Sequence, residues 1–204
     1  MSRGAPTGRS AGSFADPAGP FNPDAGHPPL VIVHSLMTDL ETPRLLLRPM
    51  DASDALRVVA GTPGDDSYWA PGYPSPGEMA AAERFLDTCA RSGDPSPFGS
   101  YEIRRREDGQ VIGGLGFHGA PDENGHVTIG YGLVPSAQGM GYASEALRAL
   151  LRFARDQGVS SVHGDTDLDN VASQRVMEAA GMRLVKEDEK LKHYRIDWDP
   201  QAEE

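Results

Sequence analysis

The chain has 204 residues, 38% of them apolar, which is enough for one domain with a single hydrophobic core. Its net charge of −11 argues against nonspecific nucleic-acid binding, which needs clustered positive charge, and favours a cationic partner. No apolar run approaches the roughly 18 residues of a membrane span, and no apolar signal segment opens the chain. A single cysteine, Cys89, excludes an internal disulfide, so we expect a cytoplasmic protein.

The first 36 residues differ in composition from the rest of the chain. They are rich in Gly, Pro, Ala and Ser and bury little apolar surface, which predicts a flexible extension. Their two arginines balance their two aspartates, so the net charge of −11 lies entirely in residues 37–204. We predict an extension over 1–36, with residues 30–33 as a candidate edge strand, and one folded domain over 37–204.

Hydrophobic periodicity and turn residues predict a series of strands and helices in the remainder. Strands are expected over 44–48, 99–105, 110–117, 127–133, 159–165, 182–186 and 191–198. Helices are expected over 51–60, 75–91 and 171–180, and a further helix should run from the glycine-rich segment 138–143 to about 157. Ser75-Pro76-Gly77-Glu78 reads as a capping box with proline in the first turn. An antiparallel meander with one strand–helix–strand unit is an α+β fold.

The most informative segment joins the strand over 127–133 to the helix that follows it. The loop between them carries, in order, Gln138, Gly139, Met140, Gly141, Tyr142 and Ala143. The first N–H groups of a helix lack partners within it, and the helix dipole adds partial positive charge there. Glycine at 139 and 141 lets a ligand approach the backbone. The pattern therefore predicts a site for phosphate or pyrophosphate.

Two kinds of protein place such a loop against phosphate groups. Residues 139–144 are close to the dinucleotide-binding pattern G-x-G-x-x-G, although the third glycine is a serine, and Asp165 follows about 20 residues later. The alternative pattern, Gln-x-x-Gly-x-Ala, is carried by Gln138, Gly141 and Ala143. It resembles the acyl-CoA pyrophosphate loop of the GNAT superfamily of N-acetyltransferases. An ordinary glycine-rich turn is the third interpretation.

Two further segments resemble the same superfamily. Residues 170–173 read Asn-x-x-Ser, begin a short helix and precede Gly181-Met182, as in the last conserved segment of GNAT enzymes, where Phe usually stands in place of Met. Residues 42–49, Thr-Pro-Arg-Leu-Leu-Leu-Arg-Pro, followed by Asp51, resemble the opening strand of the RimJ/RimL-type branch. Three motifs in the expected order favour a GNAT enzyme over a dinucleotide-binding one.

The resemblance implies a mixed, mostly antiparallel twisted sheet flanked by helices, with a splayed central strand pair. Acetyl-CoA or another acyl-CoA is expected between those strands, with Leu133 and Val134 bonding the pantetheine arm. Residues 138–143 would hold the pyrophosphate, and Asn170 would order the pantetheine or a water. A backbone N–H near Gly132 or Leu133 would steady the thioester oxygen as it gains charge. The resemblance implies no metal.

The implied reaction is direct attack of a neutral primary amine on the thioester, which requires a proton acceptor. The central strand lacks the glutamate that many GNAT members place there. The base is therefore open between Asp165, His126, Glu123 and a base that acts through a water molecule, with Asp165 preferred. Ser173 is expected to donate a hydrogen bond to the departing thiolate, although a first-turn serine also bonds helix backbone. Asn170 belongs to the same catalytic group, and it is equally a good helix N-cap.

The resemblance to the RimJ/RimL-type branch implies that the acceptor lies near the loop over 61–74, where Tyr68, Trp69 and Tyr73 are suited to cation–π contact with an amine. A packed surface loop is the alternative interpretation. The resemblance allows a protein N-terminus, a peptide or a small metabolite as acceptor, and it allows a homodimer. The missing strand glutamate keeps open a catalytically inactive acyl-CoA-binding sensor or interaction module. A dinucleotide-dependent enzyme is the third hypothesis.

Overall fold

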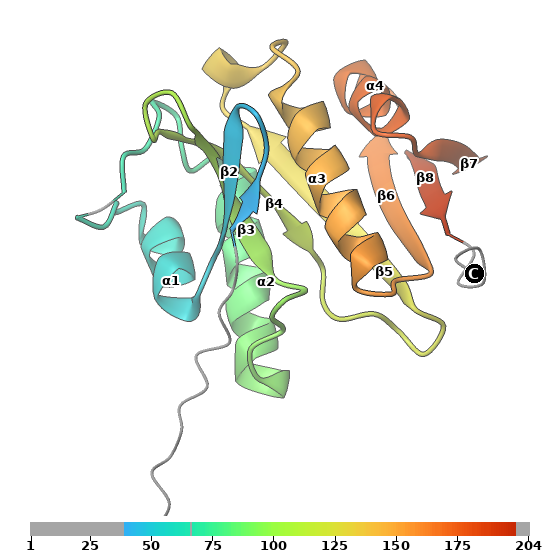
Figure 1. Cartoon of the computed structure of the whole chain (residues 1–204), viewed down its shortest axis with the longest axis horizontal. Coiled ribbons are helices and arrows are strands. Elements are labelled where there is room, and N and C mark those ends of the chain that lie inside the picture. Colours follow the sequence, from blue (N-terminus) through green and yellow to red (C-terminus); the bar gives the residue numbers. More distant parts are fainter. Residues whose placement is uncertain (1–38, 66, 199–204) are drawn as a thin grey trace, which may run out of the picture. The chain divides into compact units, whose positions relative to one another are not determined.

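The computed structural model describes residues 39–65 and 67–198, so the predicted extension over 1–36, with its candidate strand, lies outside the described residues. The described part holds a sheet in the order β1-β2-β3-β4-β5-β6-β8-β7 (Figure 1). Every neighbouring pair is antiparallel except β5 and β6, which are parallel. The fold is therefore α+β with a mixed, mostly antiparallel sheet, as the sequence predicts.

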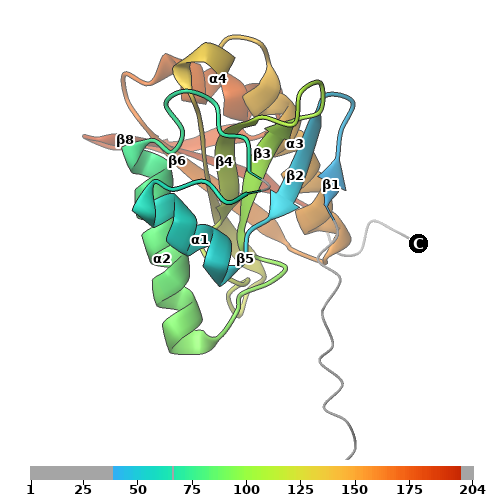
Figure 2. The same ribbon diagram turned by 90° about the vertical axis from the view of Figure 1, so that its left-hand side faces the viewer.

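The bounds of the elements follow the predicted pattern closely. The strands are β1 (Leu40–Glu41), β2 (Leu45–Pro49), β3 (Ser100–Arg105), β4 (Val111–Phe117), β5 (His126–Leu133), β6 (Ser161–Asp167), β7 (Arg183–Glu187) and β8 (Leu191–Asp197). The helices are α1 (Ala52–Ala60), α2 (Pro76–Ser92), α3 (Tyr142–Asp156) and α4 (Val171–Ala179). Helices α1 and α2 cover one face of the sheet, and α3 and α4 cover the other (Figure 2).

Local side-chain chemistry explains where the helices begin and how they pack. The predicted capping box of α2 is present, because Ser75 and Glu78 each accept the other's backbone N–H. Asp51 caps α1 in the same way with Asp54. Helix α3 packs on the sheet through one apolar face, on which Leu147, Leu150 and other small or branched residues are fully buried.

Two elements differ from the prediction by more than one residue, each for a backbone reason. Helix α3 begins only at Tyr142, because Gly139 and Gly141 take left-handed conformations with φ of 75° and 80°. Strand β6 begins two residues later than predicted, because the Val159 N–H donates to the Ala154 carbonyl and so closes the end of α3. The short strand β1 was not predicted.

The central strands β5 and β6 separate part of the way along the sheet. They pair only at His126↔Ser161, Val127↔Val162 and Thr128↔His163. Beyond Thr128, β5 stays paired with β4 as far as Leu133, and β6 stays paired with β8 as far as Asp167. A wedge therefore opens between β5 and β6 toward the end where α3 and α4 begin (Figure 1).

The close approach of β4 to β5 requires glycine at 113. A Cβ added to Gly113 would lie 2.1 Å from the carbonyl oxygen of Gly132. We expect Gly113→Ala to lower the free energy of unfolding by about 1–3 kcal/mol, because backbone cannot move aside cheaply. Urea denaturation would measure this loss.

Gly77→Ala is the matched control, because its Cβ would meet only the Ser75 hydroxyl oxygen, at an ordinary 3.6 Å. It replaces glycine in the first turn of α2, so we expect a gain of about 0.5 kcal/mol. If the two substitutions changed the free energy of unfolding equally, Gly113 would not be needed for the close approach of β4 to β5.

Candidate active site

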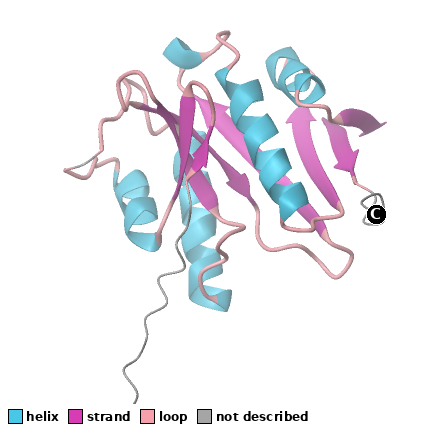
Figure 3. Cartoon of the chain, in the orientation of Figure 1, coloured by secondary structure: helices cyan, strands magenta, loops and turns pink. Residues whose placement is uncertain are grey.

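The loop between β5 and α3 has the geometry of an anion-binding helix start. After β5, residues Pro135–Ala137 form a 3-10 turn, and Gly141 then caps α3 without any side-chain hydrogen bond (Figure 3). The Gln138 side chain turns back and donates to the Leu133 carbonyl oxygen at 3.0 Å. Residues Gly139, Met140 and Gly141 are exposed. The first N–H groups of α3 are therefore accessible at a left-handed glycine turn, which suits a pyrophosphate.

Arg44 fixes this loop to the start of the folded domain. Its guanidinium donates to the Met140 carbonyl oxygen at 3.0 Å and forms an ion pair with Glu145 at 2.6 Å. The same guanidinium lies over the ring of Tyr142, 4.6 Å from its centroid. Thr42 adds a hydrogen bond to Glu145 at 2.7 Å. The motif over 42–49 thus holds the glycine loop in place, a role that the sequence did not reveal.

Glu145 is held as a carboxylate by this arrangement. Burial by itself raises the pKa of the Glu145 carboxyl. Hydrogen bonds from Thr42 and from the backbone and guanidinium of Arg44 outweigh burial and leave that pKa below its ordinary value. The ion pair that anchors the loop is therefore charged at neutral pH.

The wedge between β5 and β6 contains a cavity of about 260 Å³. The side chains of Tyr131, Asp165, Asn170 and Ser173 line it, so the structure brings together the three residues predicted to be catalytic. The Tyr131 hydroxyl lies 2.8 Å from the Ser173 hydroxyl oxygen. Asn170 accepts the Ser173 N–H at 3.1 Å and caps α4, as predicted. Ser173 is thus positioned by β5 and by its own helix cap.

Backbone groups at the end of β5 face the wedge. The Val134 N–H donates to Ile112 of β4 at 2.9 Å. Because successive strand residues direct their N–H groups to opposite edges, the Leu133 N–H points toward β6, from which β5 has already separated. This places a donor where an extended pantetheine arm would add to the sheet edge.

Asp165 makes contacts that the sequence did not anticipate. Its carboxylate lies 2.6 Å from His193 Nδ1, and His193 Nε2 lies 2.7 Å from Asp188. His126 and Glu123, the other candidate bases, lie at the far end of β5 and in the turn before it. Both are remote along β5 from the wedge, which opens only beyond Thr128.

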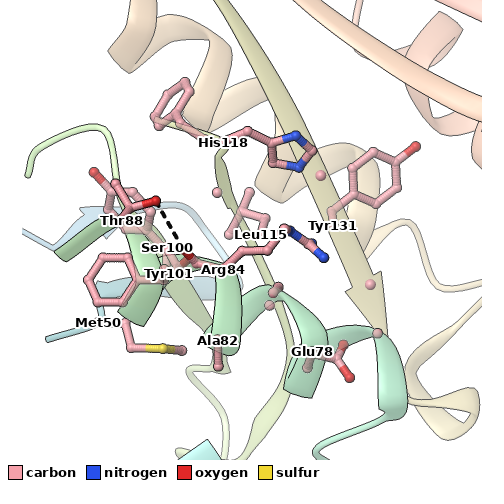
Figure 4. A pocket seen from close by; sticks show the side chains of 18 of the residues that line it. Met50, Glu78, Ala82, Arg84, Thr88, Ser100, Tyr101, Leu115, His118 and Tyr131 are labelled. Atoms are coloured by element: carbon pink, nitrogen blue, oxygen red, sulfur yellow. Dashed lines mark hydrogen bonds between the residues drawn. The ribbon is translucent and has the colours of Figure 1, made fainter. Parts of the chain in front are cut away.

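A second pocket, of about 380 Å³, lies between α2 and the glycine-rich strands β4 and β5 (Figure 4). Glu78 and Arg84 of α2, His118 after β4 and Tyr131 of β5 line it. Gly130 and Tyr131 line both this pocket and the wedge cavity, so the two spaces meet at β5. The sequence identified Glu78 only as a capping residue, and nothing in its spacing showed that it lies beside β5.

The three aromatic residues predicted to receive the acceptor lie in different environments. Only Tyr73 lines the pocket under α2, and it is buried. Trp69 packs edge-on against Tyr73, with ring centroids 5.2 Å apart, and pairs with Val111 of β4. Tyr68 is 63% exposed. The loop thus closes one end of the pocket mainly through Tyr73.

Comparison with known proteins agrees with this architecture. The family model described as acetyltransferase (GNAT) domain matches residues 44–183. The uncharacterized N-acetyltransferase YjdG of Bacillus subtilis (strain 168) is 30% identical over 165 residues, which cover 78% of this chain and 97% of YjdG. A GNAT-family acetyltransferase from Bacillus anthracis has a similar fold, with a TM-score of 0.57 at 21% identity, covering 78% of this chain and 98% of that chain.

Another solved relative was determined with its coenzyme. RimL, a ribosomal L7/L12 alpha-N-protein acetyltransferase in complex with coenzyme A, gives a TM-score of 0.57 at 20% identity, covering 80% of this chain and 100% of that chain. The fold is α+β, with a mostly antiparallel sheet whose central strands β5 and β6 separate. This chain belongs to the GNAT acetyltransferase family. The family's general reaction is acyl-CoA-dependent N-acetyl transfer.

The mostly antiparallel sheet excludes the dinucleotide-binding interpretation of the glycine loop.

Two features are absent from the described residues. No group of three or more His, Cys, Asp or Glu residues that would hold a metal ion occurs in them. None of the helices within 39–198 is long and apolar enough to span a membrane.

The anchoring role of Arg44 predicts a binding defect. Arg44→Ala removes both the bond to Met140 and the ion pair to Glu145. We expect the dissociation constant for acetyl-CoA to rise about tenfold, equivalent to about 1.4 kcal/mol. Isothermal titration calorimetry would measure the change. Arg152→Ala, at an exposed position of α3, is the control and should bind acetyl-CoA as the wild type does.

The His193 contacts predict a pH-dependent stability. Its hydrogen bond to Asp188, and then that to Asp165, raise the pKa of His193 above its ordinary value. A raised folded-state pKa stabilises the fold fully below the unfolded value of about 6.5, and the contribution disappears as pH rises through the folded pKa. Urea denaturation between pH 5 and 9 should therefore show a fall in stability that His193→Gln abolishes. An identical pH profile for both proteins would contradict this assignment.

Proposed function

We propose that this chain is an N-acetyltransferase that moves an acetyl group from acetyl-CoA to a primary amine by direct attack. The observation that carries the proposal is the meeting of two cavities at Gly130 and Tyr131 of β5. One cavity lies in the wedge that continues to the glycine loop, and the other lies under α2. A donor and an acceptor that approach from opposite sides of β5 would meet there.

The donor side fits acyl-CoA through groups that are present in the chain. The N–H groups at Gly141 and the first turn of α3 would hold the pyrophosphate, and the Leu133 N–H would bond the pantetheine arm. Val134, the other residue predicted for this contact, is not available, because its N–H donates to Ile112 and its carbonyl oxygen accepts the Ala137 N–H. A CoA thioester supplies an activated acyl group and a thiolate leaving group when it is bound. Membership of the RimJ/RimL-type branch rests on the motif over 42–49 and on the likeness to RimL.

The catalytic assignments rest on the wedge cavity. The Ser173 hydroxyl, held by Tyr131 and by the Asn170 cap, would donate a hydrogen bond to the departing sulfur. Asp165 stays a candidate base. Its carboxylate lies 2.6 Å from His193 Nδ1, while His193 Nε2 contacts Asp188, so both ring nitrogens already face carboxylates. Tyr73 would border the acceptor, and Tyr68 and Trp69 belong to the same loop.

Ligand-dependent melting and turnover test the proposal together. A donor at about 100 times its dissociation constant should stabilise the protein by about 2.7 kcal/mol. We expect this shift with acetyl-CoA and not with NAD, and release of free thiol when an amine is added. Stabilisation by acetyl-CoA without turnover on any amine would instead indicate a catalytically inactive binding module. The absence of any shift with CoA species would overturn the proposal.

Ser173→Ala tests the proposed proton donor. We expect kcat to fall by about 100-fold, the lower end of what a positioned proton donor contributes, with little change in acetyl-CoA affinity. Tyr131→Phe should give a smaller fall, because it removes only the group that orients Ser173. Steady-state kinetics and calorimetry would separate the two parameters. A fall in affinity with unchanged kcat would assign Ser173 to donor binding instead.

A further inference from the structure

Glu78 is a buried carboxylate with one oxygen left over for a ligand. The residue is only 8% exposed. Its Oε2 accepts the Ser75 N–H at 2.7 Å, whereas Oε1 has no hydrogen-bond partner among the described residues. Burying a carboxylate oxygen without a partner is unfavourable. The free oxygen is therefore suited to a ligand that brings positive charge or an N–H donor into the pocket under α2.

Glycines in β5 leave room for the Glu78 side chain. A Cβ on Gly132 would lie 2.8 Å from Glu78 Oε1, and a Cβ on Gly130 would lie 3.0 Å from His118 Nε2. These two glycines are two residues apart and share one face of β5, so their positions are separated by about 7 Å. Any larger residue at either place would displace a polar side chain from the pocket. Glu78 thus lies against the strand where the two cavities meet.

Arg84 supplies a second charge to the same pocket. Its guanidinium extends toward β5 in the space between His118 and Glu78 (Figure 4). It makes no hydrogen bond or ion pair within residues 39–65 and 67–198. Desolvation of the ring and then the nearby Arg84 lower the pKa of His118, so the imidazole is neutral at neutral pH. Arg91 also lines this pocket, but it lies about two turns farther along α2, so Arg84 is the cation that an acceptor would meet nearer Glu78.

We infer that the pocket takes a small primary amine that also carries an anionic group, with the amine at Glu78 and the anion at Arg84. The inference rests on the proposed acyl transfer and names its acceptor class. A cavity of about 380 Å³ is of the size that holds small molecules. A carboxylate or a phosphate would each satisfy Arg84 with paired hydrogen bonds, because the guanidinium fork matches both groups.

The reaction would proceed with Glu78, in place of Asp165, as the proton acceptor, because Glu78 lines the pocket under α2 and Asp165 lines the wedge cavity. The acceptor enters as an ammonium, and Glu78 Oε1 takes one proton and leaves a neutral amine. The amine nitrogen forms a bond to the thioester carbonyl carbon, and the carbon–sulfur bond breaks with its electron pair on sulfur. The second nitrogen proton passes to the thiolate, beside Ser173, so the products are an amide and a free thiol. Glu78 returns its proton to water.

Matched acceptors test the role of Arg84. We compare 3-aminopropanoate with propylamine, and ethanolamine phosphate with ethanolamine, using acetyl-CoA as donor. The anionic member of at least one pair should have the higher kcat/KM, and the better pair identifies carboxylate or phosphate. Arg84→Gln should raise KM for that anionic acceptor by about 10- to 100-fold and leave KM unchanged for the matched amine that lacks the anionic group. Arg152→Gln, exposed on α3, is the control and should change neither.

The acidity of the acceptor tests the role of Glu78. Glu78→Gln keeps the capping box, because glutamine also bonds the N-cap N–H, so the variant should fold. We expect kcat/KM for 3-aminopropanoate to fall by about 100-fold. The fall should be much smaller for 2,2-difluoro-3-aminopropanoate, whose less basic amine is already largely neutral. Glu83→Gln, at an exposed position of the same helix, should have no effect.

The outcomes separate this inference from the proposed function. Equal kcat/KM within both acceptor pairs, or higher kcat/KM with a peptide N-terminus than with any small amine, would overturn the anionic-amine class while leaving acyl transfer intact. An equal loss in Glu78→Gln with both the basic and the fluorinated amine would overturn the role of Glu78 as proton acceptor. Failure of the wild type to bind any acyl-CoA would overturn the proposed function itself.

Discussion

The separation of β5 from β6 after Thr128 is the constraint on which the rest of the structure depends. Strands that part in mid-sheet leave backbone N–H and C=O groups without partners, which is unfavourable unless another chain or a ligand supplies them. Helix α4 and its cap residues close one side of this gap. The glycine loop and α3 begin at its open end. One missing stretch of pairing thus creates the wedge cavity, which opens toward the start of α3.

The glycines of β4 and β5 form a second, steric constraint. Gly113 allows the two strands to approach, while Gly130 and Gly132 leave room for His118 and Glu78 on the opposite side from the wedge. A strand with ordinary side chains at these positions would be easier to form, since glycine weakens strands. The packing of buried neighbouring residues offsets this cost. In return, the glycines leave β5 accessible from both sides. Such a strand suits a reaction between two bound molecules.

Charge is distributed differently in the pocket and over the whole chain. The net charge of −11 led us to expect a cationic acceptor. Under α2, however, Arg84 stands beside Glu78, and the imidazole of His118 is neutral at neutral pH. A bound ligand interacts mainly with the few charges that line its pocket, because water and salt screen the charges farther away. The overall charge therefore says little about what this pocket binds.

The sequence by itself determined the elements, the α+β class and the glycine loop, because periodicity, caps and turn glycines act over a few neighbouring residues. Ser75 with Glu78 and Asn170 with Ser173 were recognisable as local caps for this reason. Only the tertiary structure decided which side chains meet across the sheet: Arg44 with Glu145, His193 with Asp165, and Glu78 with β5. Such contacts join residues up to about a hundred positions apart. Their partners are fixed by strand register and helix packing, which no local pattern encodes.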